Sequence, residues 1–251
     1  MKLKFYVINL KRAADRRQLM SDQLDKYGVD YEIFEATDGR ALSAEDEQKL
    51  ALSDQVILEM AGGRKCMVED KMCPPEVGCA LSHLRLYQHI LDQGVERAVI
   101  LEDDVVLNDD SLLALNQLDV ISEPWDVVHF SEDLGIKNLP EFLRRKYYID
   151  QARGLYFARL GMHNESLDAI FNRRRLVLRT AFYVVTPQAC QILLKLGYPV
   201  RINADYLLGS IAYNHLKMFL GYPVGHYLVP NEVDKQSSIG SDRPKHRLVR
   251  L

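Results

Sequence analysis

Short apolar segments alternate along the chain with longer stretches in which apolar residues recur at helical spacing. The short segments predict buried strands at residues 3–9, 31–35, 98–101, 125–130 and 180–186. The longer stretches predict helices at 13–27, 76–91, 187–196 and 205–218. Strands separated by helices favour an α/β fold with a mostly parallel central sheet. Ligands of such sheets bind outside the carboxyl ends of the strands.

Local signals mark where several of these elements begin and end. Gly28 ends the first helix, and Ser43 followed by acidic residues is typical of a helix N-cap. Residues 61–75 contain a Gly-Gly and a Pro-Pro pair and predict a mobile loop. The stretch 131–179 is less regular and predicts an insertion, and the basic residues 243–251 predict a frayed tail.

Composition and charge narrow the class of protein. The 251 residues are 47% hydrophobic and 27% charged, as in ordinary globular proteins, and we expect a single domain over residues 1–251. The net charge of −3 argues against a globally basic nucleic-acid binder. Apolar runs fall short of the roughly 18 residues that span a bilayer. The first residues predict a buried strand rather than a signal peptide, so we expect a cytoplasmic protein.

The number and spacing of the cysteines argue against a structural zinc site and against disulfides. The four residues Cys66, Cys73, Cys79 and Cys190 form no C-x2-C pair, and no histidine pair has zinc-finger spacing. A structural zinc site is therefore not expected. A chain of this length is able to fold without disulfides, so we expect reduced thiols.

Three acidic residues, Glu102, Asp103 and Asp104, directly follow the apolar strand at 98–101. Carboxylates packed this closely repel one another and raise each other's pKa values unless a cation lies between them. Mg²⁺ or Mn²⁺, which prefer oxygen ligands, would remove the repulsion and would also bridge to a diphosphate. The same acids also fit a simple acidic loop that caps the following helix.

Basic residues gather just after the first strand and in the first turn of the next helix. Arg12 and Arg16 lie where cations oppose the helix dipole, which indicates that something else favours them. An anionic ligand such as a nucleoside diphosphate would do so. The alternative is a solvated helix face on which Asp15 pairs locally.

The segment 76–83 brings polar atoms to an otherwise apolar helix. Gly78 permits a close backbone approach near the helix start, while Ser82 and His83 supply polar side chains. A single helical histidine also fits a purely structural role. The sequence offers no convincing Ser-His-Asp set, which argues against hydrolysis by a catalytic triad.

An ordered set of motifs along most of the chain resembles glycosyltransferase family 25, the lipooligosaccharide galactosyltransferase group. Each motif alone is weak, but their order and spacing together are specific. Residues 131–178 match least, and Arg179-Thr180 stands where the family usually has glycine. The matching pieces are VINLKR (7–12), RR (16–17), FEATDG (34–39), EVGCALSH (76–83), ILEDDV (100–105), AFYVVT (181–186) with Ala189, NADYLL (203–208) and SSI (237–239).

The resemblance implies a GT-A type fold with a nucleotide-sugar-binding sheet between helices. It also implies a UDP-sugar donor, most often UDP-galactose, and an inverting reaction that gives a β-linkage. UDP gains negative charge as it leaves, and Mn²⁺ or Mg²⁺ would stabilise that charge. Inversion requires a general base beside the acceptor hydroxyl, on the face opposite UDP.

The resemblance suggests roles for individual residues. Glu102 and Asp104 would hold the metal, and His226 is a further candidate ligand. Asp205 is the expected general base, although it also fits a helix N-cap. Glu132 and Asp133 are the rival bases. The expected contacts of the nucleotide sugar are Asn9, Arg12, Arg16, Asp38, Ser82, His83 and Asp103, of which Asp38 also fits a plain turn residue.

The acceptor is less constrained than the donor. Residues 137–179 hold ten basic and four acidic residues, which fits either an anionic acceptor or a solvated basic insertion on the acceptor side. A phosphorylated lipooligosaccharide or other glycan at the cytoplasmic face of the inner membrane would suit the first interpretation, with peripheral membrane contact at most. A metal-dependent phosphohydrolase or nucleotidyltransferase, or a non-catalytic nucleotide-sugar-binding protein, are the alternative functions. The sequence indicates neither the acceptor nor the oligomeric state.

Overall fold

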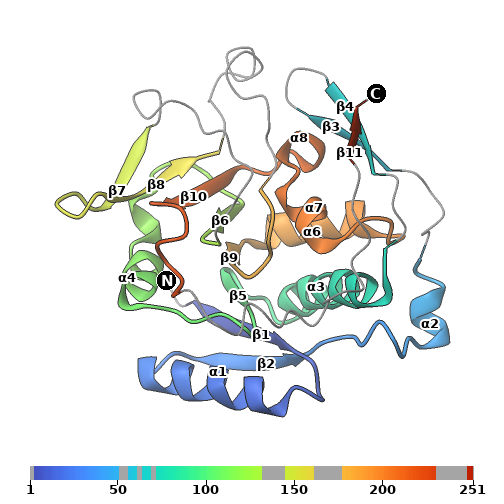
Figure 1. Ribbon diagram of the computed structural model, residues 1–251. Coiled ribbons are helices and arrows are strands. Elements are labelled where there is room, and N and C mark those ends of the chain that lie inside the picture. Colours follow the sequence, from blue (N-terminus) through green and yellow to red (C-terminus); the bar gives the residue numbers. More distant parts are fainter. Residues whose placement is uncertain are drawn as a thin grey trace.

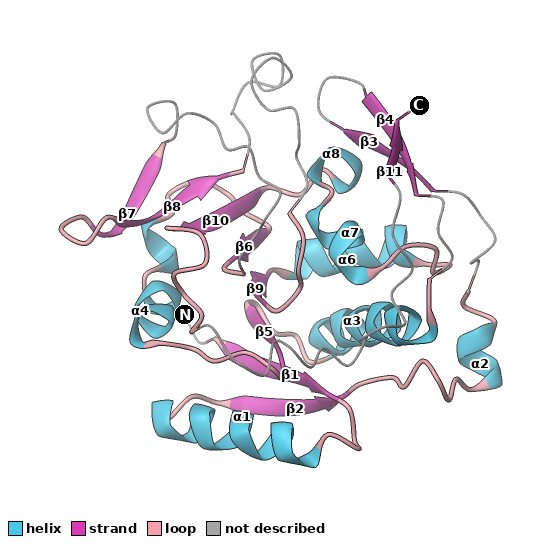
Figure 2. Cartoon of the chain, in the orientation of Figure 1, coloured by secondary structure: helices cyan, strands magenta, loops and turns pink. Residues whose placement is uncertain are grey.

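A central eight-stranded sheet organises the chain, with helices packed against both of its faces (Figure 1, Figure 2). The computed structural model describes residues 3–50, 56–60, 64–68, 72–131, 145–160, 177–229 and 248–250. The sheet has the strand order β2-β1-β5-β9-β6-β10-β8-β7. Its strands are β1 (Lys4–Asn9), β2 (Tyr31–Glu35), β5 (Ala98–Glu102), β6 (Val127–His129), β7 (Lys146–Asp150), β8 (Leu155–Arg159), β9 (Phe182–Val185) and β10 (Met218–Tyr222).

The sheet is mixed, but most of its strands point the same way. β1 pairs in parallel with β2 and β5, and β6 pairs in parallel with β10. β9 runs antiparallel to β5 and β6, and β8 runs antiparallel to β10 and β7. Six of the eight strands of this sheet therefore share one direction, and the carboxyl ends of β1, β5 and β6 lie at one edge. The helices are α1 (Ala14–Tyr27), α2 (Ala44–Glu47), α3 (Pro74–Asp92), α4 (Asp109–Asn116), η1 (Leu118–Val120), α6 (Pro187–Gly197), α7 (Ala204–Gly209) and α8 (Ile211–Asn214).

Alternation of side chains along the strands builds two separate cores. Tyr6, Ile100 and Tyr183 face α3, α6 and α7, whereas their neighbours Phe5 and Val99 face α1 and α4. Because consecutive strand residues point to opposite faces, helices cover both sides of β1 and β5. The α/β fold with a central sheet flanked by helices, expected from the sequence, is confirmed.

Several predicted element ends are also confirmed. Gly28 ends α1 in the left-handed conformation, with φ of 64°. Ser43 caps α2 by accepting a hydrogen bond from the Asp46 amide at 3.1 Å. The described cysteines Cys73, Cys79 and Cys190 have free thiols. None of the described helices is long and apolar enough to cross a membrane.

The predicted final helix at 205–218 is wrong. The segment forms the short helices α7 and α8 and then enters strand β10. The Asn214 side chain donates to the carbonyls of Leu207 and Leu208 and accepts from the Leu216 amide, and His215 adopts a φ of 58°. These contacts turn the chain back into the sheet, and the helical spacing of apolar residues does not reveal them.

Three segments expected to be irregular contain regular structure. Within 61–75, residues Arg64–Val68 form β4, which pairs with β3 (Val56–Met60), and Pro74 and Pro75 begin α3. In the basic tail, Leu248–Arg250 form β11 antiparallel to β4. Residues 145–160, within the expected insertion, form β7 and β8 and extend the main sheet. The remaining residues of 137–176 lie outside the described chain.

A close backbone contact joins the loop after β2 to the first turns of α3. A Cβ added to Gly78 would lie 2.5 Å from the Gly39 nitrogen and 2.6 Å from the Thr37 carbonyl oxygen. A Cβ on Gly39 would lie 1.6 Å from the Pro74 carbonyl oxygen. The predicted close approach at Gly78 is therefore confirmed, and glycine is required because any side chain would force these backbones apart.

We expect Gly78→Ala to lower the free energy of unfolding by about 1–3 kcal/mol, the usual cost of overpacking. The sign of this change is informative. Inside a helix without such a clash, alanine is about 1 kcal/mol more favourable than glycine, so the same substitution would raise the free energy of unfolding. Urea unfolding followed by circular dichroism measures the change. Gly94→Ala is the control, since its Cβ would meet no neighbouring atom within 4 Å and only its positive φ opposes the change. A Gly78→Ala protein of wild-type stability would contradict the packing argument.

Candidate active site

The acid triplet at the end of β5 is divided between the two faces of the sheet. Continuing the alternation of β5, Glu102 points to the α3 face and Asp103 to the α1 face. The partners of each side chain agree with this assignment, because Glu102 meets His83 of α3 and Asp103 meets Arg16 of α1. Glu102 and Asp103 therefore have separate surroundings, although they are adjacent in the sequence.

Asp103 is held in a buried polar network. Its Oδ2 accepts a hydrogen bond from Asn9 Nδ2 at 2.6 Å, and its Oδ1 lies 3.1 Å from Arg16 Nη1. Arg17 in turn donates through Nε to Asn9 Oδ1 at 3.1 Å. Burial raises the pKa of Asp103, and the Arg16 charge and the Asn9 amide oppose that rise. Asn9, Arg16 and Asp103, all expected at the nucleotide site, thus bind one another and fix the ends of β1 and β5.

Glu102 is more open, with about a third of its side chain exposed. Its Oε1 accepts a hydrogen bond from Thr180 Oγ1 at 2.5 Å and lies 3.8 Å from His83 Nε2. Burial alone would raise the pKa of Glu102, but His83, the Thr180 hydroxyl and the charge of Arg179 outweigh it and leave that pKa lowered. Glu102 therefore favours the charged form that binds a cation.

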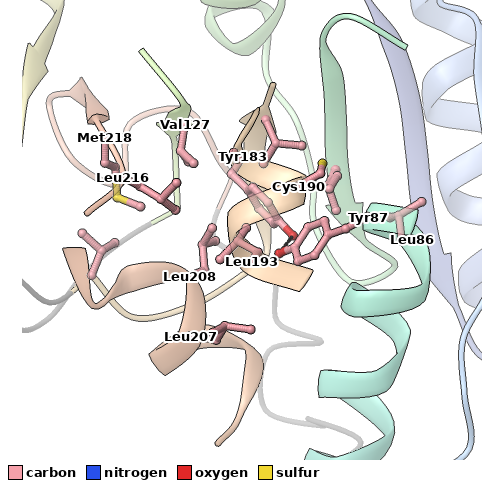
Figure 3. Packing of buried hydrophobic residues seen from close by; sticks show 14 of the residues in the cluster. Leu86, Tyr87, Val127, Tyr183, Cys190, Leu193, Leu207, Leu208, Leu216 and Met218 are labelled. Atoms are coloured by element: carbon pink, nitrogen blue, oxygen red, sulfur yellow. Dashed lines mark hydrogen bonds between the residues drawn. The ribbon is translucent and has the colours of Figure 1, made fainter. Parts of the chain in front are cut away.

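Two buried tyrosines hold the imidazole ring of His83 in place. Its Nδ1 lies 2.7 Å from the Tyr183 hydroxyl, which lies 2.9 Å from the Tyr87 hydroxyl. Figure 3 shows the two hydroxyl groups meeting among apolar side chains of the core. His129, stacked on the Tyr183 ring, contacts the Arg179 carbonyl through Nε2 at 2.7 Å. Burial lowers the pKa of His129 to about 4, so that ring is neutral at pH 7.

Cys79 lies one helical turn before His83 and is surrounded by acids. Burial, followed by the negative charges of Glu102, Asp205, Glu76 and Asp104, raises the pKa of its thiol well above the usual range. Asp205 therefore lies in the same region as Glu102 and Asp104, although it is far from both in the sequence. In this region the described Cys79, His83 and Glu102 offer ligand atoms that all lie within 4.8 Å of one another.

Asp205 lies in the first turn of α7, but it is not the N-cap. Asn203 holds the N-cap position, and its side chain makes no capping bond. Asp205 is half-buried and accepts from the Tyr206 amide at 3.0 Å. Asp205 thus satisfies one amide of the first helical turn without holding the N-cap position.

The loop after β2 holds further residues expected at the nucleotide site. Arg12 forms an ion pair with Asp38, and both side chains are partly exposed. Ser82 accepts a hydrogen bond from the Thr37 amide at 2.8 Å and donates to the Gly78 carbonyl at 2.6 Å. Ser82 therefore holds the loop in place, while Arg12 and Asp38 remain accessible from outside.

His226, the further candidate metal ligand, pairs with Asp110 and not with the acids at the end of β5. Its Nε2 lies 2.7 Å from Asp110 Oδ2, and the other oxygen of Asp110 lies 2.6 Å from Arg153 Nη1. His226 is not part of the potential metal-binding group described above. The rival bases Glu132 and Asp133 lie outside the described residues.

Sequence reasoning missed four residues of this region: Cys79 as a metal-ligating group, Thr180, Tyr183 and Tyr87. For Cys79 a signal was present, because its four-residue spacing from His83 puts both side chains on one helix face. Thr180, Tyr183 and Tyr87 carry no local signal, since their contacts join elements that are far apart in the sequence.

Comparison with known proteins identifies the class to which this acidic α/β site belongs. The profile of glycosyltransferase family 25, described as an LPS biosynthesis protein family, matches residues 2–208. The chain belongs to glycosyltransferase family 25. The resemblance seen in the sequence is thereby confirmed.

Curated relatives match over shorter segments. A "Glycosyltransferase 25 family member" of Aedes aegypti is 35% identical over 100 residues, covering 40% of this chain and 16% of that protein. The human "Procollagen galactosyltransferase 2" is 34% identical over 100 residues, covering 40% of this chain and 15% of that protein. The matched segments are thus a small part of these longer relatives.

Two further similarities complete the comparison. A "Probable inactive glycosyltransferase 25 family member 3" of Bos taurus is 27% identical over 153 residues, covering 57% of this chain and 25% of that protein. Among solved structures, a glycosyltransferase involved in the glycosylation of the major capsid of PBCV-1 is 11% identical with a TM-score of 0.36, covering 78% of this chain and 66% of that one.

Arg179 adopts a backbone conformation that favours glycine, with φ of 75°. Arg179 belongs to the pair Arg179-Thr180, where the resemblance leads us to expect glycine. A left-handed conformation costs a residue with a Cβ about 1–2 kcal/mol. We expect Arg179→Gly to be more stable than Arg179→Ala by about 1 kcal/mol, because both remove the side chain and only alanine keeps the backbone penalty.

Thermal and urea unfolding of the two variants test this expectation. At residues with ordinary backbone angles, alanine is as stable as glycine or more so. An alanine variant at least as stable as the glycine variant would show that the strain at Arg179 is absent.

Proposed function

We propose that this protein is a metal-dependent inverting glycosyltransferase. It moves a hexose, galactose from UDP-galactose, to a glycan acceptor with a β-linkage. The observation that carries the proposal is that Glu102, Asp104 and Asp205 all lie near enough to Cys79, by the carboxyl end of β5, to raise the pKa of its thiol. Family membership supports transfer of a sugar, and a human relative bears the name of a galactosyltransferase.

Glu102 and Asp104 would hold Mn²⁺ or Mg²⁺ beside the diphosphate of the donor. The lowered pKa of Glu102 suits this role, because the charged carboxylate is the form that binds a cation. Such an ion, when bound, neutralises charge on the departing UDP. Arg12, partly exposed beside Asp38, would contact the nucleotide, whereas Arg16 already pairs with Asp103.

Asp205 would act as the general base. In an inverting transfer the acceptor oxygen bonds to the anomeric carbon as the bond from that carbon to the diphosphate oxygen breaks. The proton of the acceptor hydroxyl must pass to a nearby base, here a carboxylate oxygen of Asp205.

The acceptor would be an anionic glycan. The excess of basic residues in 137–179 supports this choice. The edge hairpin β7-β8 carries part of that stretch, including Arg153 and Arg159. A phosphorylated lipooligosaccharide or lipopolysaccharide core at the cytoplasmic face of the inner membrane is the acceptor we favour. We propose peripheral contact with that membrane.

A non-catalytic nucleotide-sugar-binding role is the second candidate, because the family includes a relative named as a probable inactive member. Release of UDP from UDP-galactose, measured with and without a glycan acceptor and Mn²⁺, separates the two. Release that rises strongly with acceptor supports transfer. Binding of UDP-galactose without turnover on any acceptor would support the second candidate.

We expect Asp104→Ala to lower the rate of transfer at least about a hundredfold, or roughly 2.7 kcal/mol of barrier, because it removes a metal-binding carboxylate. The fold should survive, since a half-exposed loop residue contributes little to stability. Initial rates at saturating UDP-galactose measure the loss. Asp22→Ala, an exposed change on α1, is the matched control and should retain full activity. Near-normal turnover of Asp104→Ala, or insensitivity to EDTA, would overturn the assignment.

We expect Asp205→Asn to bind UDP and metal normally and to lose about 10²–10⁴-fold in transfer rate, the usual range for acid–base catalysis. Asparagine keeps the size of the side chain and removes only its ability to accept a proton. Calorimetric UDP binding and initial rates separate the two effects. Full activity, with large losses in Glu132→Gln or Asp133→Asn instead, would transfer the role to the segment after β6. Lost UDP binding would place Asp205 at the donor instead.

A further inference from the structure

Three side chains that differ in chemistry converge at the carboxyl end of β5. Cys79 and His83 lie four residues apart on α3, so they share one helix face, and Glu102 ends the strand that this face covers. The Cys79 sulfur, a ring nitrogen of His83 and a carboxylate oxygen of Glu102 all lie within 4.8 Å of one another. The combination of thiol, imidazole and carboxylate differs from the all-oxygen site that the acid triplet predicts.

The Nε2 atom of His83 is buried without a hydrogen-bond partner in the described part of the chain. The residue is 1% exposed, and Nε2 lies 3.8 Å from Glu102 Oε1, beyond hydrogen-bond distance. Either neutral tautomer leaves a polar atom unsatisfied here, a lone pair in one case and an N–H group in the other. An unsatisfied buried polar atom is costly, and a cation at this point would use the lone pair.

The opposite nitrogen of His83 is anchored as in a metal-binding histidine. Metal-ligating histidines donate their second N–H to a fixed partner, which sets the tautomer and the direction of the ring. Here Nδ1 lies 2.7 Å from the Tyr183 hydroxyl, and Tyr87 holds that hydroxyl at 2.9 Å. Donation from Nδ1 to Tyr183 leaves the Nε2 lone pair directed toward Glu102.

We propose that Cys79, His83 and Glu102 form a three-ligand site for Zn²⁺ or a transition-metal ion of similar preference, with a fourth position open to water or a ligand oxygen. Zinc takes sulfur, imidazole and carboxylate ligands, and its catalytic sites hold three protein ligands and one open position. Bond lengths of about 2.0–2.3 Å place neighbouring tetrahedral ligands about 3.4–3.7 Å apart. The 3.8 Å between His83 Nε2 and Glu102 Oε1 is already close to that spacing.

The charges around the three ligands also favour a cation. Asp104, Asp205 and Glu76 lie close enough to act on Cys79 electrostatically, whereas Arg179 is the cation that acts on Glu102. A bound dication would offset this negative charge, and the Cys79 thiol would release its proton on binding. This site shares Glu102 with the Mn²⁺ or Mg²⁺ site of the proposed function, so the two ions would compete for that carboxylate. Zinc binding itself does not depend on sugar transfer; only the use of the open position by the donor rests on the proposed function.

Cobalt titration of the purified full-length protein tests the site directly. Co²⁺ replaces Zn²⁺ in such sites, and its bond to a thiolate gives a strong charge-transfer absorption. After removal of metal by chelation, we expect this band on adding Co²⁺ and its loss on adding Zn²⁺. Cys79→Ser should abolish the band. Cys73→Ser, at the N-cap of α3 where serine is favourable, is the matched control and should keep it.

A second variant probes the anchor of the ring. Tyr183→Phe removes only the hydroxyl that holds His83 Nδ1, and loss of such a partner usually weakens metal binding 10–100-fold. We expect that loss of Co²⁺ affinity with the band retained. Unchanged affinity would remove Tyr183 from the site and leave its role purely structural.

Whether a sulfur ligand binds the zinc is also measurable on the wild-type protein, so the test stands even where a variant fails to fold. X-ray absorption of the zinc-loaded wild-type protein should show one sulfur ligand at about 2.3 Å. A zinc environment without sulfur, no charge-transfer band in the wild type, or a full band in folded Cys79→Ser would each overturn the proposal. Sulfur ligation without sugar transfer would contradict the proposed function alone. Transfer supported by Mg²⁺ in a protein without sulfur ligation would contradict the metal site alone.

Discussion

The buried contact between Asn9 and Asp103 is the constraint on which the active region depends. It joins the carboxyl ends of the parallel neighbours β1 and β5, at 2.6 Å and away from water. A buried carboxylate is costly unless it is paired, so Arg16 must approach from α1 to offset the charge. Because strand side chains alternate, fixing Asp103 on this face fixes Glu102 on the other.

That division separates structural from chemical roles within one acidic motif. Asp103 is 9% exposed, and both of its oxygens contact residues of its own domain. Glu102 is more open and faces His83, Thr180 and Cys79. Glu102 and the nearby Asp104 are therefore the candidates for binding a donor or a metal. Asp103 instead holds the end of β5 against the end of β1.

The sequence predicted those parts of the fold in which local pattern and burial agree. β2 and the start of α6 match the predicted bounds, because their apolar runs end at clear boundaries. At β10 the apolar spacing predicts the end of a helix instead, because the turn before this strand depends on the Asn214 side chain donating to two carbonyls. At the site, acids following a strand were visible, but Thr180 and Tyr183 reach it only through pairing of β9 with β5.

The motif at 76–83 acquires a physical meaning once its helix faces are separated. Gly78 and Ser82, four residues apart, face the loop after β2: the first admits its backbone and the second bonds the Thr37 amide. Cys79 directly follows Gly78, and His83 directly follows Ser82. One residue turns the helix by about 100°, so Cys79 and His83 share a different face, which is directed toward Glu102. One short segment thus fixes the loop that carries Asp38 and supplies two groups to the end of β5. A substitution on either face should therefore change one of these functions without the other, which neither a simple core helix nor a plain capping motif would allow.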